Sequence, residues 1–475
     1  MKRNKFIMVG LLALSLTTAC NKVLETKETD LIAGDVALKT VANNQQGIIG
    51  AYAAMNVEMG ILMNATFADE VRVGEFYNAG TTHEWQYAST DIGLRDNFTA
   101  FPLYYRIIDR VNRVLAALPN ATAANATEEA LKARLRGEAL FLRAFCHFEL
   151  FRYYCNSTTG TDLAVFYMET PSLNPQARMT VAQFIPKLKA DLTACKPLLP
   201  SATTDVFRAN QAAASALQAR VAIYLKDWDD AINFSTEYIN AFPLATRAQF
   251  PGIWTDANRT ELAFKLSRTA SLGGRIGSLF RGTSANAANI GTITWLPSNK
   301  LYNSYDQTND VRFSTYFKTE TLLPSNRPNI IINKYAGTAY GTPNENVADA
   351  KVFRTGEMFL IRAEAKAEKN DLTGAAADLN DLRAARIAGY TPATFASKDA
   401  LITAIMDERF KELPYEGHRF WDLKRRNLPV QRLATDAPTA NSQTLPAGNF
   451  RFVLPIPNTE LQANPLMVQN PGYVN

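Results

Sequence analysis

The feature that most restricts the fold is a helical repeat of apolar residues, which runs through most of the chain. Segment 127–154 carries apolar residues on more than one face: Leu140, Phe141, Ala144, Phe145, Phe148 and Phe151. Because a helix with that pattern is buried on all sides, this segment is predicted to be a central helix. Asn125 and Glu128, three residues apart, form an N-cap pair of the capping-box type at its start.

The same repeat predicts further helices on both sides of this one, at about 34–59, 97–118, 180–197, 208–226, 229–241, 351–369, 372–387 and 398–413. A polar stretch at about 64–95 is expected to form loops. From Phe242 to Asn346 the helical repeat is lost. A structureless loop of about 100 residues is implausible in a compact chain, so this stretch is predicted to be a subdomain of loops and small strands. A tail with several prolines, from Pro429 to Asn475, is expected to follow the surface.

Small residues recur at a constant spacing in two of the predicted helical pairs. Ala219, Ala231 and Pro243 are 12 residues apart, and so are Ala363 and Ala375. Small residues at these points let paired helices approach closely, as in tetratricopeptide repeats. Two clear units fall short of the roughly three that a regular solenoid needs, so plain antiparallel helix pairs are the alternative. The predicted fold class is mainly α.

The first residues predict the compartment. A short basic region precedes the apolar run 6–16, which is followed by Thr17-Thr18-Ala19-Cys20. The run is too short for a bilayer, which needs about 20 residues, but it fits a signal-peptide core. A Cys after small residues is similar to a bacterial lipobox, although Thr17 stands where Leu is usual. We expect removal of residues 1–19, acylation of Cys20, and a polar tether over 20–32. An ordinary secretory signal is the alternative.

Composition excludes several classes of protein. Of 475 residues, 47% are hydrophobic and 20% are charged, which is typical of a globular chain. The net charge is +5, and three positive charges lie in the predicted signal peptide, which leaves the mature chain near +2. This does not favour nucleic-acid binding. Four Cys in this length exclude a disulfide scaffold.

Several motifs, in order along the chain, resemble those of the SusD/RagB outer-membrane lipoproteins. They are Leu140–Leu150, Asp310-Val311-Arg312, Arg354–Ala365, Glu408–Arg425, Leu454–Pro457 and Gln469–Tyr473. Together they are specific, whereas each alone would be weak. The resemblance implies one SusD-like domain over 33–475, built on tetratricopeptide-like pairs, with an irregular ligand-side insertion at about 242–346. It also implies a lipid anchor in the outer membrane and a TonB-dependent, SusC-like transporter as partner.

No motif indicates a catalytic residue, a metal or a cofactor. The three histidines form no H-E-x-x-H motif, and the cysteines form no C-x-x-C motif. Glu408, Glu412 and Glu416 are spaced by four and could suggest the paired carboxylates of a glycosidase. Basic residues nearby offer them ion partners, so a structural role is favoured and the chain is predicted not to be an enzyme.

A protein that holds sugars needs flat apolar faces beside hydrogen-bonding groups, and loop aromatics supply such faces. Trp228, Trp254 and Trp421 are predicted to be packing residues. Trp85, in a polar loop, and Trp295, in the irregular subdomain, are candidate ligand contacts, with packing as the alternative. Known sites of the family draw on these two chain regions, though through no fixed motif. Polar and aromatic neighbours complete the predicted site: Asp69, Arg72, Tyr77, Arg281 and Asn286.

The sequence therefore predicts a lipoprotein anchored in the outer membrane and facing the cell exterior. It is expected to bind a glycan non-covalently and to pass it to the transporter. A peptide-binding or purely adaptor lipoprotein of the same complex is the alternative, and a glycosidase is less favoured. No residue pattern in the predicted binding loops identifies a particular sugar.

Overall fold

The structure is a computed structural model that describes residues 37–75, 80–201, 204–271, 275–282, 293–323 and 326–473. It contains 51% helix and 8% strand, and its strands form small antiparallel pairs. This confirms the predicted mainly α fold. The predicted signal peptide and tether, with Cys20, lie outside the described residues.

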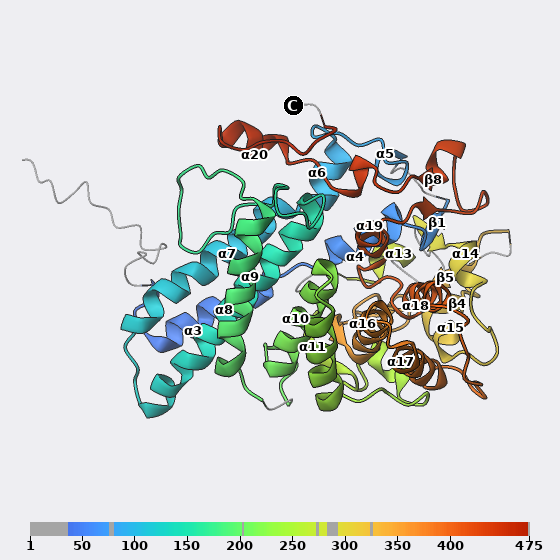
Figure 1. Cartoon of the computed structure of the whole chain (residues 1–475), viewed down its shortest axis with the longest axis horizontal. Helices are drawn as coiled ribbons and strands as arrows, with labels where there is room; N and C mark the ends of the chain where they lie inside the picture. Colours follow the sequence, from blue (N-terminus) through green and yellow to red (C-terminus); the bar gives the residue numbers. More distant parts are fainter. Residues whose placement is uncertain are drawn as a thin grey trace, which may run out of the picture.

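The longer helices pack against one another in chain order. They are α3 (Val41–Ala53), α7 (Ala100–Ala117), α8 (Ala126–Tyr154), α9 (Val181–Cys195), α10 (Gln211–Leu225), α11 (Trp228–Ala241), α16 (Thr355–Glu368), α17 (Leu372–Ala384) and α18 (Lys398–Glu412). Figure 1 shows α3, α7, α8 and α9 at one end, α10 and α11 in the middle, and α16 and α17 beyond them. Four alanines of the predicted spacing, Ala219, Ala231, Ala363 and Ala375, are fully buried, whereas Pro243 is exposed.

Helix α8 is the predicted central helix. Nearly every residue from Leu135 to Tyr154 is buried, and the helix contacts α3, α7 and α9. The Asn125 side chain accepts a hydrogen bond from the Glu128 backbone N–H at 3.0 Å, which confirms the predicted N-cap. A buried ion pair between Arg143 and Asp191, at 2.6 Å, joins α8 to α9.

Short elements fill most of the rest. The short helices are α4 (Glu58–Phe67), α5 (Gly80–His83), α6 (Ile92–Phe98), α12 (Phe250–Trp254), α13 (Ser278–Arg281), α14 (Asn299–Tyr302), α15 (Val311–Tyr316), α19 (Arg419–Arg425) and α20 (Asn458–Ala463). The strand pairs are β1 (Val71–Val73) with β3 (Trp295–Pro297), β2 (Leu262–Leu266) with β6 (Ala350–Arg354), β4 (Phe317–Thr319) with β5 (Ile330–Ile332), and β7 (Val430–Gln431) with β8 (Thr444–Leu445). The short strands and helices within 242–346 agree with the predicted subdomain of loops and small strands.

Two predicted helices differ from the structure. The helix expected over 34–59 is interrupted, because residues 55–57 are not helical and α4 continues to Phe67. The start of the helix expected over 351–369 belongs to β6, which pairs with β2. By length and composition alone, Val41–Phe67 could cross a membrane, but 56% of its most apolar window is buried inside the fold. Its interruption and burial place it in the core.

The C-terminal tail follows the surface over much of its length, as predicted, but part of it enters the core. Leu454 and Ile456 are 2% and 0% exposed, whereas Leu466 and Val468 are 50% and 57% exposed. The Leu454 N–H donates to the Tyr153 carbonyl at 2.9 Å, and the Asn470 amide donates to the Tyr154 carbonyl at 3.0 Å. The apolar residues around Leu454 complete the core beside the end of α8.

Trp421 is a packing residue, as predicted. It is 1% exposed, and the Arg152 guanidinium lies 3.8 Å from the centre of its ring. Tyr153 contacts the same ring edge-on at 5.1 Å. Trp254, 2% exposed, also has the predicted buried position.

Glu412 lies at the centre of a buried group of charges. Its carboxylate accepts hydrogen bonds from Arg312, Arg354 and Arg386, and all four side chains are 0–2% exposed. These residues come from α18, α15, β6 and the turn after α17. Neighbouring charges extend the group, which we call the Glu412 cluster: Glu261, Asp310, Arg312, Lys334, Arg354, Arg383, Arg386, Glu408, Glu412 and Glu416.

The cluster confirms a structural role for the three glutamates spaced by four. Glu408 bonds Arg312 and Arg383 at 2.6 Å each, and Glu416 bonds Arg354 and Lys334 at 2.7 Å each. Burial opposes ionisation of Glu408, but the adjacent cations, Arg312 foremost, outweigh it and lower the pKa of Glu408 to about 2. These carboxylates are therefore committed to ion pairs.

We predict that Arg312→Ala lowers the free energy of unfolding by about 3–5 kcal/mol, because it leaves buried carboxylates short of their partner. Urea denaturation measures the change. Arg113→Ala is the control, since Arg113 forms an exposed pair with Asp109 and should cost about 0.5 kcal/mol or less. Equal stability of the two variants would contradict the importance of the cluster.

Candidate functional site

The two tryptophans predicted to contact a ligand are buried. Trp85 and Trp295 are 3% and 5% exposed. The Trp85 indole N–H donates to the Phe67 carbonyl at 2.9 Å, and the Arg432 guanidinium lies 4.3 Å from the ring centre. The Trp295 ring lies 5.1 Å from that of His83. Both indoles fill the interior, which agrees with packing, the alternative kept for each. Ligand contact by either one stays a prediction.

The structure does bring the two predicted chain regions together. Strands β1 and β3 pair in antiparallel register, with Val73 opposite Trp295 and Arg72 opposite Leu296. Arg72 is half-buried, and its Nε has no partner within the described part of the chain. Tyr77 and Asn286 lie outside the described residues.

Asp69 is committed to the interior. It is 1% exposed and bonds Arg419 at 2.8 Å and Lys300 at 2.6 Å. Burial opposes its charge, but Arg419 and Lys300 outweigh burial and hold the pKa of Asp69 well below its usual value. Asp69 therefore ties α4 to α19 and α14, and both its oxygens are occupied.

Arg281 is the predicted residue that lines a large hollow. The hollow has a volume of about 510 Å³ and is formed by α12, α13, α15, β4 and the segment 333–340. In Figure 1, α13, α15 and β4 lie on the side of the molecule away from α3 and α7. We call it the Arg281 hollow; its lining includes Trp254, Arg281, Lys318, Asn333, Thr338 and Tyr340.

Arg281 and Tyr340 form a fixed pair in this wall. The guanidinium lies 4.3 Å from the centre of the Tyr340 ring. Its Nε donates to the Tyr340 hydroxyl at 3.3 Å, and its Nη1 donates to the Ala336 carbonyl at 2.9 Å. Tyr340 in turn belongs to a small apolar cluster with residues of β3 and β5. Guanidinium, amide and hydroxyl groups beside aromatic rings suit a ligand with both polar and C–H faces.

Tyr340 was missed by sequence reasoning. It lies in the turn Gly337-Thr338-Ala339-Tyr340-Gly341, whose two glycines have φ of +64° and +79°. An aromatic residue in a turn that needs left-handed glycines was the available signal. Its pairing with Arg281, 59 residues away, left no trace in the sequence.

A carboxylate also lines the hollow but is already neutralised. Glu320 is 1% exposed; it accepts hydrogen bonds from Lys318 Nζ at 3.0 Å and from the Leu322 N–H at 3.1 Å. It therefore contributes structure and not a free acid or base.

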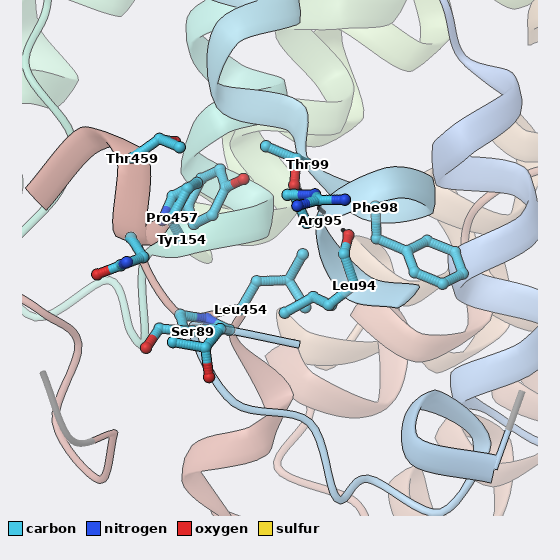
Figure 2. Close-up of a pocket in the computed structure, with 12 residues that line it drawn as sticks. Ser89, Leu94, Arg95, Phe98, Thr99, Tyr154, Leu454, Pro457 and Thr459 are labelled. Carbon is cyan, nitrogen blue, oxygen red and sulfur yellow. Dashed lines mark hydrogen bonds between the residues drawn. The ribbon is translucent and has the colours of Figure 1, made fainter. Parts of the chain in front are cut away.

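A smaller hollow of about 170 Å³ lies between α6 and the C-terminal segment. In Figure 2, Leu94 and Leu454 face each other across it, and Phe98 points away. The Tyr154 hydroxyl accepts a hydrogen bond from the Ala100 N–H at 3.1 Å. Arg95 on its rim is exposed and bonds Asp96 at 2.7 Å. Because Arg95 already has a carboxylate partner, this hollow has fewer groups that could hydrogen-bond a polar ligand than the Arg281 hollow has.

Two family models match the chain. The model described as "SusD family" matches residues 294–473, and the model described as "Starch-binding associating with outer membrane" matches residues 24–225. The chain belongs to the SusD/RagB family. The buried side chains of α8 and of the Glu412 cluster hold this fold together.

Relatives of the same family cover the whole chain. SusD-like protein P2 of Formosa agariphila is 27% identical over 100% of both chains, and SusD-like protein P25 of that organism is 22% identical over 96% of this chain and 97% of its own. Among solved structures, a SusD superfamily protein from Bacteroides thetaiotaomicron matches with a TM-score of 0.77 and 24% identity, over 91% of this chain and 100% of its own. A protein described as "Laminarin binding SusD-like protein" matches with a TM-score of 0.72 and 20% identity, over 92% and 100%. These structures show a shared fold.

We predict that Trp85→Ala lowers the free energy of unfolding by about 3–5 kcal/mol, because it empties a buried position between Phe67 and Arg432. Chemical denaturation measures the loss. Trp228→Ala is the control and should cost less, since Trp228 is only partly buried. Unchanged stability together with lost glycan binding would instead make Trp85 a ligand contact.

Proposed function

We propose that this chain is an outer-membrane lipoprotein that faces the cell exterior, binds a glycan non-covalently and passes it to a TonB-dependent, SusC-like transporter. The observation that carries the proposal is the pair of family matches, of which one is described as starch-binding and associated with the outer membrane. The fold shared with a laminarin-binding protein supports a sugar as the ligand.

The Arg281 hollow is the proposed glycan site. Its aromatic and guanidinium groups are held rigidly by the contacts of Arg281 with Tyr340 and Ala336, so little entropy is lost when they contact a ligand. The side-chain amide of Asn333 also lines its wall and can meet sugar hydroxyls.

Binding without bond cleavage is the proposed mode of action. A glycosidase needs two carboxyl groups that reach the scissile bond. Glu408, Glu412 and Glu416 are held in buried ion pairs, and Glu320 is neutralised by Lys318. These contacts support a receptor that releases its ligand unchanged.

We propose one domain for the mature chain, over residues 33–475. One apolar core cluster contains residues from Val41 on α3 to Ile456 in the C-terminal segment, including residues of the irregular part. Such continuity supports the irregular region, about 242–346, as a ligand-side insertion in one body and not as a separate unit.

We predict that the purified protein binds one class of glycan with a Kd of about 1 μM to 1 mM, a range that allows ready release. A glycan array followed by titration calorimetry measures this. Binding of peptides but not glycans would make it a peptide receptor. Binding of neither, with retained association to the transporter, would make it an adaptor.

We predict that Cys20→Ala moves the protein from the membrane fraction to the soluble fraction, because acyl chains on Cys20 are the proposed anchor. Fractionation after a high-salt wash measures it, and Lys22→Ala is the control that should stay in the membrane. Retention of the Cys20 variant would rule out this anchor.

A further inference from the structure

Arg281 is a buried cation without a carboxylate partner. It is 3% exposed, and it makes no ion pair within the part of the chain that the structure describes. Other buried arginines have a carboxylate partner: Arg220 bonds Glu357 and Arg425 bonds Glu364, each at 2.6 Å. A buried charge is costly unless it is paired or fully hydrogen-bonded, so Arg281 is an exception that needs a reason.

Arg178 shows how a buried arginine can be satisfied without an acid. Its guanidinium donates to four backbone carbonyls and to the Asn470 side chain, which occupies all three nitrogens. Arg281 has only two acceptors, the Tyr340 hydroxyl and the Ala336 carbonyl. Its Nη2 therefore has no acceptor among the described residues, although the side chain lines a hollow of about 510 Å³.

The acids near Arg281 form no ion pair with it among the described residues. Glu320 lines the hollow but is bound by Lys318, and Glu345 accepts a hydrogen bond from the Gly341 N–H at 2.7 Å. Since Lys318 and Glu320 neutralise each other, the lining of the hollow carries one unbalanced positive charge.

We propose that the Arg281 hollow binds an acidic group of the glycan, a carboxylate or a sulfate ester, so that the ligand is an acidic oligosaccharide and not a neutral one. This rests on the proposed glycan-binding function. A guanidinium donates strong, charge-assisted hydrogen bonds to such oxyanions, and Tyr340 and Ala336 hold this one in place before the ligand arrives.

Titration calorimetry tests the proposal with three probes of equal length: a uronate-containing oligosaccharide, a sulfated one and a neutral one. The parent protein should bind one acidic probe at least about tenfold more tightly than the neutral probe, as expected for hydrogen bonds to a charged group. A comparison of the affinities for the two acidic probes shows whether the site prefers a carboxylate or a sulfate ester.

Two variants locate the site. Arg281→Gln should weaken the acidic probe about tenfold or more and weaken a neutral probe much less, whereas Arg95→Gln, in the hollow of Figure 2, should have no effect on either. Thr338→Glu adds a negative charge at an exposed position of the rim, where folding is not at risk, and should weaken the acidic probe similarly. Thr338→Gln is its neutral control.

The outcomes separate the two proposals. Equal or tighter binding of the neutral probe, with no effect of Arg281→Gln and Thr338→Glu, would overturn the acidic-ligand inference and leave glycan binding intact. Absence of binding to all glycans on an array would overturn both. If Arg281→Gln does not fold, the pair of Thr338 variants decides the question.

Discussion

The Glu412 cluster is the constraint on which the rest of the structure depends. It joins α15, β6, the turn after α17 and α18, so that residues as distant as Arg312 and Glu412 are in contact. Buried ion pairs add little net stability compared with apolar contacts, but each partner becomes indispensable once the others are buried. The cluster therefore fixes how the irregular part sits against the helices. Helix α15 carries both Arg312 and Thr315, so the same contact positions one wall of the Arg281 hollow.

Two of the arginines that lie over aromatic rings show that similar contacts can have different roles. Arg432 over Trp85 and Arg281 over Tyr340 are each 4.3 Å from the ring centre. Arg432 also donates to four backbone carbonyls, so its contact closes the interior. Arg281 donates to two acceptors and borders a hollow. The number of occupied donors, and not the stacking itself, separates a packing contact from a candidate binding contact.

The sequence could predict the features that depend on residues close together in the chain. Helix α8 with its Asn125 cap follows from periodicity and a three-residue spacing, and the packing of Trp421 follows from its motif. The burial of Trp295 could not be predicted, because it depends on the pairing of β1 with β3 across more than 200 residues. That of Trp85 depends on Arg432, which is far away in the chain. Arg281 was chosen as a neighbour of Trp295, whereas its place in the structure comes from its contact with Tyr340, which could not be predicted because the two residues are 59 apart.

The contacts of the C-terminal segment affect the order in which the chain folds. Tyr153 and Tyr154, at the end of the central helix, obtain backbone partners from Leu454 and Asn470, and Arg178 obtains two of its acceptors from residues 468 and 470. The interior around α8 is therefore incomplete until almost the last residue has been synthesised. Contacts between such distant residues form late, because a long loop must close first. The contacts of Leu454 and Asn470 with the end of α8 therefore form among the last in folding.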